Sequence, residues 1–349
     1  MEMCLNTWKK SFFGCIVILI IFQSLCNAQA NLGNDTTYYI FFPESITGRL
    51  YLSQKYTSFV IKSKEAKDLR YVPDTKLNIG IGATWHNLSL NLAIGFAFLN
   101  KDLDKGKTKY IDLQSHLYRT KWATDFYGQF YKGYHLNPEG VAAKPGENFY
   151  YRPDVNVTLI GVTNYYIFNS KRFSYRAAFI QNEWQKKSAG TFLLGGEAYY
   201  GLINGDSALV PRSIEDKYPE KGIHRIDYLS VGPGAGYAYT LVVAKHVFFT
   251  GSLTGNLNLS YAVESNYIDH NNNFSLNFVP GIKAAAGYNS RSWIISANFT
   301  GNDLPFKGAT PENKYSVRTG NFRFIISKRF MPGKKLQKTL SPLDMFFKD

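Results

Sequence analysis

Hydrophobic and polar side chains alternate strictly over two long stretches of the chain. Residues 76–100 are KLNIGIGATWHNLSLNLAIGFAFLN, in which two alternating arms flank the pair His86-Asn87, and residues 246–261 repeat the pattern. Such alternation predicts a β-strand with one apolar face and one small or polar face. Each arm is about ten residues long, the length that a tilted strand needs to cross a bilayer. We therefore predict an all-β fold, a transmembrane antiparallel β-barrel.

The same pattern recurs along the chain in segments separated by turn residues. We expect strands at residues 49–61, 77–85, 88–98, 110–118, 120–134, 154–168, 173–185, 189–203, 225–241, 246–261, 274–288, 292–300 and 315–330. Long loops are expected at residues 62–75, 101–109, 135–153, 204–224, 262–273 and 301–314. Pro233 and Pro280 fall inside strand segments, where we expect bulges or bends because proline lacks the backbone N–H.

Residues 172–203 decide the number of strands. Single-chain bacterial barrels have an even number of strands, with short periplasmic turns and longer extracellular loops. Short and long connections alternate along the chain except within residues 172–203, which must therefore cross the membrane once or three times. One crossing gives twelve strands and three crossings give fourteen. We favour twelve, with residues 181–188 (QNEWQKKS) partly outside the wall.

The first 28 residues have the form of a secretory signal peptide. Lys9-Lys10 precede an apolar run at residues 11–22, and Cys26-Asn27-Ala28 offers a cleavage site. The run is shorter than a membrane-spanning helix. A lipoprotein processed at Cys26 is the alternative, although Leu25 stands where such signals need a small residue.

Four parts of the chain follow from these patterns: a signal peptide (1–28), an N-terminal lead-in (29–48), the β-barrel (49–330) and a C-terminal tail (331–349). The lead-in is periplasmic, plugs the barrel base or packs on its wall. All three cysteines lie in the signal peptide, so the mature chain has no disulfide, thiolate metal site or cysteine nucleophile.

Composition agrees with an outer-membrane barrel and narrows its partners. Aromatic residues make up 16% and charged residues 19% of the chain, which suits a lipid-facing wall with aromatic girdles. The net charge of +14 is scattered, with no basic helix or RNA-binding motif, so nucleic acid is not expected as a partner. The expected partners are the lipid bilayer, lipopolysaccharide and, during insertion, the barrel-assembly machinery.

Candidate catalytic and metal-binding motifs have simpler explanations. Gly205-Asp206-Ser207 resembles a lipase nucleophile block, but it follows Asn204 before a long loop and suits a turn. Ser115 and His116 are neighbours on a strand, so their side chains point to opposite faces and form no nucleophile–base pair. None of the six histidines has the close spacing of metal ligands, so no metal or cofactor is expected.

Four charged residues fall on otherwise small or polar strand faces: Arg176, Glu197, Lys283 and Arg323. We expect all four side chains to face the lumen. Such charges either set ion selectivity and bind a solute, or form an ion-pair network that fills the barrel.

Three segments carry a resemblance to a known family. Residues 36–56 (TTYYIFFPESITGRLYLSQKY), 131–137 (YKGYHLN) and 173–196 (FSYRAAFIQNEWQKKSAGTFLLGG) together resemble the uncharacterised domain-of-unknown-function family DUF4421. The resemblance covers about residues 36–330 and implies a bacteroidete outer-membrane barrel with a signal peptide. It brings no activity and no site residues.

We therefore expect a non-enzymatic barrel in the bacterial outer membrane, acting as a small channel, a solute-binding protein or a structural wall protein. One alternative is a barrel enzyme acting on lipid or lipopolysaccharide, which predicts a serine and a histidine converging from different strands near the outer rim. The other alternative is a secreted soluble β protein.

Overall fold

A computed structural model describes residues 33–63, 66–85, 88–95, 105–310, 312–333 and 336. The chain forms two compact units, residues 1–34 and 35–349, and everything below concerns the second. The predicted signal peptide, its three cysteines, the turn His86-Asn87 and most of the tail lie outside the described residues. In the described part, no helix is long and apolar enough to span a membrane.

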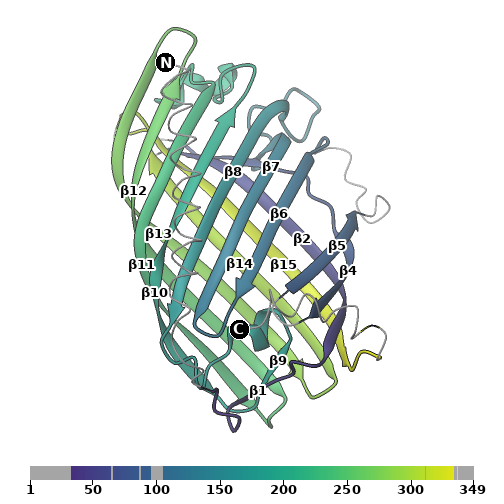
Figure 1. The fold of residues 1–349 in the computed structure, drawn as a ribbon. Coiled ribbons are helices and arrows are strands. Elements are labelled where there is room, and N and C mark those ends of the chain that lie inside the picture. The colour runs from purple at the N-terminus through teal and green to yellow at the C-terminus, as the bar shows by residue number, and fades with distance from the viewer. Residues whose placement is uncertain are drawn as a thin grey trace. The chain divides into compact units, whose positions relative to one another are not determined.

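Ten strands close into an antiparallel ring, because the last strand, β15, pairs with β2 along its whole length (Figure 1). Around the ring the order is β2, β15, β14, β13, β12, β11, β10, β8, β7, β3 and back to β2. The strands are β2 (Ile46–Lys62), β3 (Leu69–Val72), β7 (Trp122–Asn137), β8 (Tyr151–Ile167), β10 (Ala189–Asn204), β11 (Arg225–Val243), β12 (Val247–Ser265), β13 (His270–Asn289), β14 (Trp293–Lys307) and β15 (Lys314–Phe330).

Three further strands belong to the same sheet: β4 (Asn78–Trp85), β5 (Leu88–Gly95) and β6 (Lys109–Tyr118). β4 pairs with β2, β5 pairs with β4, and β6 pairs with β7. No backbone pairing joins the described residues of β5 to those of β6. The total of twelve strands is therefore not confirmed, since the closed ring has ten. Part of the long loop predicted at residues 62–75 forms the strand β3. This strand has only four residues, so its alternation was too short to be recognised in the sequence.

The two ends of the barrel differ in their connections. We call the end with the short connections 119–121, 244–246 and 290–292 the turn end, and the end with residues 138–150 and 205–224 the loop end. The loop predicted at residues 262–273 shrinks to 266–269, because β12 and β13 extend further than their apolar pattern.

The predicted alternation is confirmed by the exposure of side chains along the wall. On β12, Phe249 and Leu253 are exposed, whereas Phe248 and Ser252, the residue before each of them, are buried. The same division on the other strands leaves an outer surface rich in leucine, isoleucine and aromatic residues. An apolar surface of this extent is not left in water by a soluble monomer, so it identifies a lipid-facing or partner-facing wall.

The strand predicted at residues 173–185 is wrong. This segment forms the helix α2 (Tyr175–Phe179), whose first turn is capped by the Ser174 hydroxyl, and the strand β9 (Glu183–Gln185). Every residue of α2 is buried, including Arg176, whose charge is balanced by Glu183. β10 is the one wall strand in residues 172–203, as the single-crossing interpretation required.

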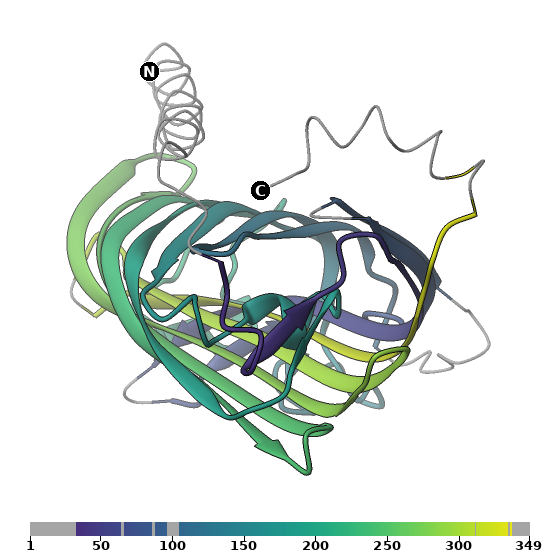
Figure 2. The same ribbon diagram turned by 60° about the horizontal axis from the view of Figure 1, so that its bottom comes forward.

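The lead-in joins this segment inside the turn end. β1 (Tyr39–Phe41) pairs with β9, and the Tyr39 hydroxyl donates to the Ser170 carbonyl over 2.8 Å. We call residues 35–45 and 170–188 together the plug. Figure 2 shows β1 and α2 within the ring when the turn end comes forward. Of the three placements considered for the lead-in, residues 35–45 therefore take the one at the barrel base.

The prolines do not produce the expected bulges. Strand register is the same on both sides of Pro233 and of Pro280, although the β11–β12 ladder is interrupted at residues 232–233 and the β13–β14 ladder stops beside Pro280. The register shift lies instead between β7 and β8, at Gly133, whose φ of +91° a side chain rarely adopts.

Apolar side chains fill the loop-end half of the lumen. Tyr71, Tyr134, Leu136 and Phe306 point inward from the wall and are buried at 0–1% exposure. They pack with Leu209 and other residues of the loop between β10 and β11. The barrel interior at this end is therefore a packed core.

Candidate functional site

Two wall arginines hold the plug to the inner wall at the turn end, and a third arginine forms an ion pair within the plug. Arg329 of β15 donates to the carbonyls of Gln181 (2.8 Å) and Glu183 (2.7 Å). Arg49 of β2 donates to the carbonyl of Ile180 over 2.9 Å. Within the plug, Arg176 and Glu183 form an ion pair at 2.6 Å. The hydrogen bonds from these guanidinium groups to backbone carbonyls bind the plug firmly, because a charge-assisted hydrogen bond is about twice as strong as one between neutral groups.

A second polar layer centres on Asp125 of β7, which is fully buried. His116 Nδ1 lies 2.6 Å from the Asp125 carboxylate, and the Tyr118 hydroxyl donates to it over 2.7 Å. Lys283 of β13 crosses the lumen and pairs with the other carboxylate oxygen. Its ammonium also lies 5.1 Å from the centre of the Tyr118 ring and 5.8 Å from that of Tyr175. The layer is thus a buried ion pair with its polar atoms satisfied.

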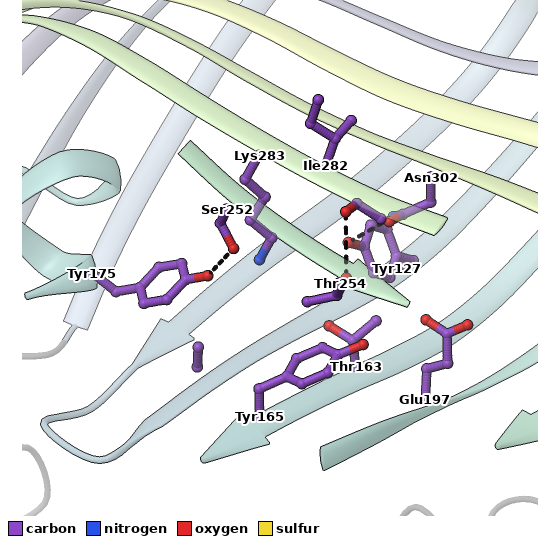
Figure 3. Close-up of a pocket in the computed structure, with 12 residues that line it drawn as sticks. Tyr127, Thr163, Tyr165, Tyr175, Glu197, Ser252, Thr254, Ile282, Lys283 and Asn302 are labelled. Atoms are coloured by element: carbon purple, nitrogen blue, oxygen red, sulfur yellow. Dashed lines mark hydrogen bonds between the residues drawn. The ribbon is translucent and has the colours of Figure 1, made fainter. Parts of the chain in front are cut away.

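A small cavity adjoins Lys283 (Figure 3). Its walls include Tyr165, Ser252 and Glu197, and its volume of about 10 Å³ holds about one water molecule. Glu197 accepts a hydrogen bond from Asn258 over 3.0 Å. Figure 3 shows Glu197 and Lys283 on different sides of the cavity. The space is too small for a solute.

A third layer centres on Asp112 of β6, nearer the loop end. Lys55 approaches the Asp112 carboxylate to 3.3 Å, the Tyr131 hydroxyl donates to it over 2.6 Å, and Gln129 over 2.8 Å. Gln129 also bonds Thr319 of β15 over 2.8 Å. Side chains from β2, β6, β7 and β15, which are neighbours around the ring, therefore meet on the inner side of the wall.

The four charged residues predicted from the sequence take different places. Arg176 lies on α2 in the plug and not on a wall strand, whereas Glu197, Lys283 and Arg323 lie on β10, β13 and β15. Arg323 is directly opposite Ser53 of β2. Its guanidinium lies over the ring of Tyr51 on β2, 5.8 Å from the ring centre. Of the four, Glu197 and Lys283 line the same small cavity from different sides.

We did not predict from the sequence which residues stand at the centres of the polar layers or bind the plug. Asp125, His116 and Asp112 share the small-and-polar faces of their strands, but alternation alone does not say which strands face each other across a lumen. Arg49 and Arg329 stand at the turn end of their strands, where they meet the plug. We did not predict this contact with the plug, because residues 173–185 were predicted as a wall strand.

The candidate catalytic residues separate as predicted. Ser115 is exposed on the outer face, while His116 points inward to Asp125. Asp206 and Ser207 lie in the loop after β10, where the Ser207 carbonyl accepts from Arg152 over 3.1 Å. Among the described residues, no group of three or more histidine, aspartate or glutamate side chains is placed to hold a metal.

One serine–histidine pair joins two different strands, as the enzyme alternative requires, although its two residues were not predicted from the sequence. His270 Nδ1 lies 2.7 Å from the Ser265 hydroxyl at the loop end. The two residues are cross-strand partners that close the β12–β13 hairpin. A hydrogen bond between such neighbours is ordinary hairpin chemistry, and no carboxylate of the described chain is bonded to His270.

The chain is similar to a known protein family and to several solved structures. A family model described as domain of unknown function DUF4421 matches residues 33–330. No curated protein matches the chain. Similar solved structures include the outer membrane protease OmpT of Escherichia coli, at 9% identity and a TM-score of 0.38, covering 84% of this chain and 98% of that chain. The attachment invasion locus protein Ail of Yersinia pestis has 10% identity and a TM-score of 0.19, covering 83% of this chain and 100% of that chain.

The outer membrane protein OprG of Pseudomonas aeruginosa is a further similar structure, with 10% identity and a TM-score of 0.20, covering 81% of this chain and 96% of that chain. At these identities the likeness says nothing about activity. The family model, in contrast, spans every described strand from β1 to β15. The chain therefore belongs to the family of domain of unknown function DUF4421.

Proposed function

We propose that this protein is a bacterial outer-membrane β-barrel with a closed lumen, a wall and binding protein that does not conduct solutes. The loop end faces outward and the turn end faces the periplasm. The exposed apolar wall supports a place in a bilayer, because lipid is the solvent that such a surface prefers. The secretory signal predicted at residues 1–28 supports export to the outer membrane.

The observation that carries this proposal is the filling of the lumen at successive levels. The plug occupies the turn end, the Lys283–Asp125 pair spans the middle, the polar layer around Asp112 lines the wall beside it, and an apolar core fills the loop end. An ion would have to displace buried, hydrogen-bonded groups at every level. Each displaced layer leaves polar atoms unpaired at a cost of about 1–3 kcal/mol per group.

The proposed wall has twelve crossings. β3 and β4 follow each other along the chain and pair with the loop-end and turn-end parts of β2, as two halves of one crossing do. β5 and β6 supply two more crossings. Their outward side chains support contact with lipid, since Leu92 is 74% exposed and Leu113 is 65% exposed.

Cysteine labelling tests the twelve crossings and the orientation, because the mature chain as predicted has no cysteine. In intact cells, Ser207→Cys in the loop after β10 should react with a water-soluble maleimide. Leu92→Cys and Leu113→Cys should react only after the membrane is dissolved in detergent. Rapid labelling of Leu92→Cys in intact membranes would remove β5 from the lipid-facing wall.

Conductance in a planar bilayer tests the closed lumen. Folded protein inserted from detergent should give no stable current steps. The Arg329→Gln variant, which loosens only the plug, should also give no current steps, because the two polar layers and the loop-end core remain. Stable steps from either protein would overturn the closed-lumen proposal.

A lipid-modifying enzyme is the second candidate, favoured by the Ser265–His270 pair at the loop end. The imidazole would have to act as the base that activates the hydroxyl. A fluorophosphonate probe should label the wild type and not Ser265→Ala if this is correct. Equal labelling of the wild type and Ser265→Ala, or no labelling of either, would show that the Ser265–His270 pair is only a hairpin contact.

A further inference from the structure

The connections at the two ends of the barrel carry opposite excesses of charge. At the turn end, each of the connections 119–121, 244–246 and 290–292 contains lysine or arginine, and none contains aspartate or glutamate. At the loop end, aspartate and glutamate outnumber lysine and arginine in residues 138–150 and 205–224. A surface with an excess of one sign attracts partners of the other sign. The turn end is therefore the end suited to an anionic partner.

Four exposed residues of neighbouring strands form one patch at the turn end, which we call the rim site: Tyr288, Arg291, Trp293 and Lys328. Trp293 and Lys328 are directly opposite in the β14–β15 ladder, and the Lys328 ammonium lies 5.1 Å from the centre of the Trp293 ring. Tyr288 is diagonal to Trp293 in the β13–β14 ladder, and Arg291 lies in the turn that joins those two strands. Two cations and two aromatic rings are thus gathered where the wall ends.

The two cations of the rim site are available to a ligand. Among the described residues, no carboxylate lies within ion-pair distance of Arg291 or Lys328. In the plug, by contrast, Arg172 has Asp35 at 3.9 Å. An exposed cation is stable in water without a partner, so the absence of a carboxylate does not by itself require a ligand. It leaves both charges uncompensated at the edge of the apolar wall.

An apolar strip of the outer wall leads away from the rim site. Along the outward face of β15, Lys328 follows Phe324 and Ile326, whose side chains are exposed. Exposed Ile295 extends the strip onto β14. A lysine at the end of such a strip places its ammonium at the boundary between hydrocarbon and headgroups, where tryptophan and tyrosine are also favoured. The cations and the strip therefore match the phosphate and the acyl chains of one lipid.

We propose that the rim site binds the phosphate headgroup of an anionic phospholipid of the periplasmic leaflet, with the acyl chains against the outward faces of β14 and β15. Arg291 and Lys328 donate to the phosphate oxygens, which both side chains are suited to bind. A zwitterionic headgroup is disfavoured, because its own ammonium meets two cations, and one face of the Trp293 ring already carries Lys328. The inference rests on the proposed lipid-facing wall with its turn end in the periplasm.

Lipid binding by the purified mature protein tests the rim site. The protein in a neutral detergent is titrated with dimyristoylphosphatidylglycerol, with dimyristoylphosphatidylcholine and with inorganic phosphate, and bound molecules are counted by native mass spectrometry. The wild type should bind the anionic phosphatidylglycerol more tightly than phosphatidylcholine. Lys328→Gln should raise the dissociation constant for phosphatidylglycerol about fivefold, the contribution of one cation near an anionic lipid surface. Adding Arg291→Gln should raise it further, whereas Lys328→Arg should bind as the wild type does.

Lys187→Gln is the matched control. Lys187 is an exposed cation of the same end, but it belongs to the plug, where its ammonium lies 5.4 Å from the centre of the Tyr38 ring. Its replacement should change the dissociation constant less than about twofold. Lys328 and Arg291 are exposed, so their variants should unfold at the same urea concentration as the wild type.

Selective binding of phosphatidylglycerol that Lys328→Gln weakens and Lys328→Arg retains supports the proposal. Equal binding of the two lipids, or an equal effect of Lys187→Gln, would overturn the rim site and leave the lipid-facing wall intact. Binding of inorganic phosphate with the same dependence on Lys328 would overturn the lipid as the occupant. Binding of neither lipid would also overturn the rim site, and labelling of Leu113→Cys in intact membranes would then show whether the lipid-facing wall fails with it.

Discussion

Replacing Asp125 by asparagine tests whether the luminal polar layer stabilises the barrel. The carboxylate is 0% exposed and accepts from His116, Tyr118 and Lys283, so its removal leaves the Lys283 ammonium without a counter-charge. Breaking a buried ion pair by neutralising one partner costs about 3–5 kcal/mol. We expect the free energy of unfolding to fall by about this amount.

A double variant separates the ion pair from general damage. Asp125→Asn combined with Lys283→Met removes both charges, so it should cost less than Asp125→Asn alone, with a coupling of about 1–3 kcal/mol. Asp303→Asn is the matched control, because its pair with Arg318 is about one-third exposed on both sides and should contribute less than about 1 kcal/mol.

The assay is urea unfolding of the protein folded into phospholipid vesicles, followed by tryptophan fluorescence. A loss below about 1 kcal/mol for Asp125→Asn would refute the claim that the layer is dry and tightly paired. Strict additivity of Asp125→Asn and Lys283→Met would refute their direct interaction.

Three further predictions follow from single residues. Arg329→Gln removes charge-assisted bonds to plug carbonyls and should lower stability by at least about 1.5–3 kcal/mol, with faster tryptic cleavage in the plug as the second readout. Burial raises the pKa of Glu220, in the loop after β10, to about 7. The folded state therefore holds the proton more tightly than the unfolded chain, so stability should fall by about 1–3 kcal/mol as pH rises from about 4.5 to 7, and Glu220→Gln should abolish that dependence in pH-resolved melting curves. Gly232→Ala places a methyl group 2.2 Å from the Leu257 carbonyl oxygen and should cost about 1–3 kcal/mol in urea unfolding, whereas Gly251→Ala meets nothing within 4 Å and should change stability by less than about 0.5 kcal/mol.

Alternation predicted the wall well because lipid imposes one rule on every outward position. Residues such as Leu253 and Phe249 must be apolar wherever the strand sits in the barrel, so the pattern is local and visible in the sequence. The same rule does not apply to the interior, where polar and apolar residues both occur. The apolar core at the loop end therefore had no signature of its own.

Contacts across the lumen were beyond local patterns. Lys283 meets Asp125 from a strand 158 residues later, a pairing set by the register and closure of the whole ring. The structure of the plug was not predicted from the sequence for a related reason. The five residues of its helix are too few to show a helical period, and β9 pairs with β1 from a segment more than 140 residues earlier in the chain.

Single-channel recording in a planar bilayer tests the central claim, the closed lumen, most directly. Protein shown to be folded by heat-modifiable migration, and inserted in a known orientation, should pass no stable current at either polarity. Reproducible conductance steps from such protein, changed in size by Asp125→Asn or Lys283→Met, would place an open path through the polar layers and contradict the account.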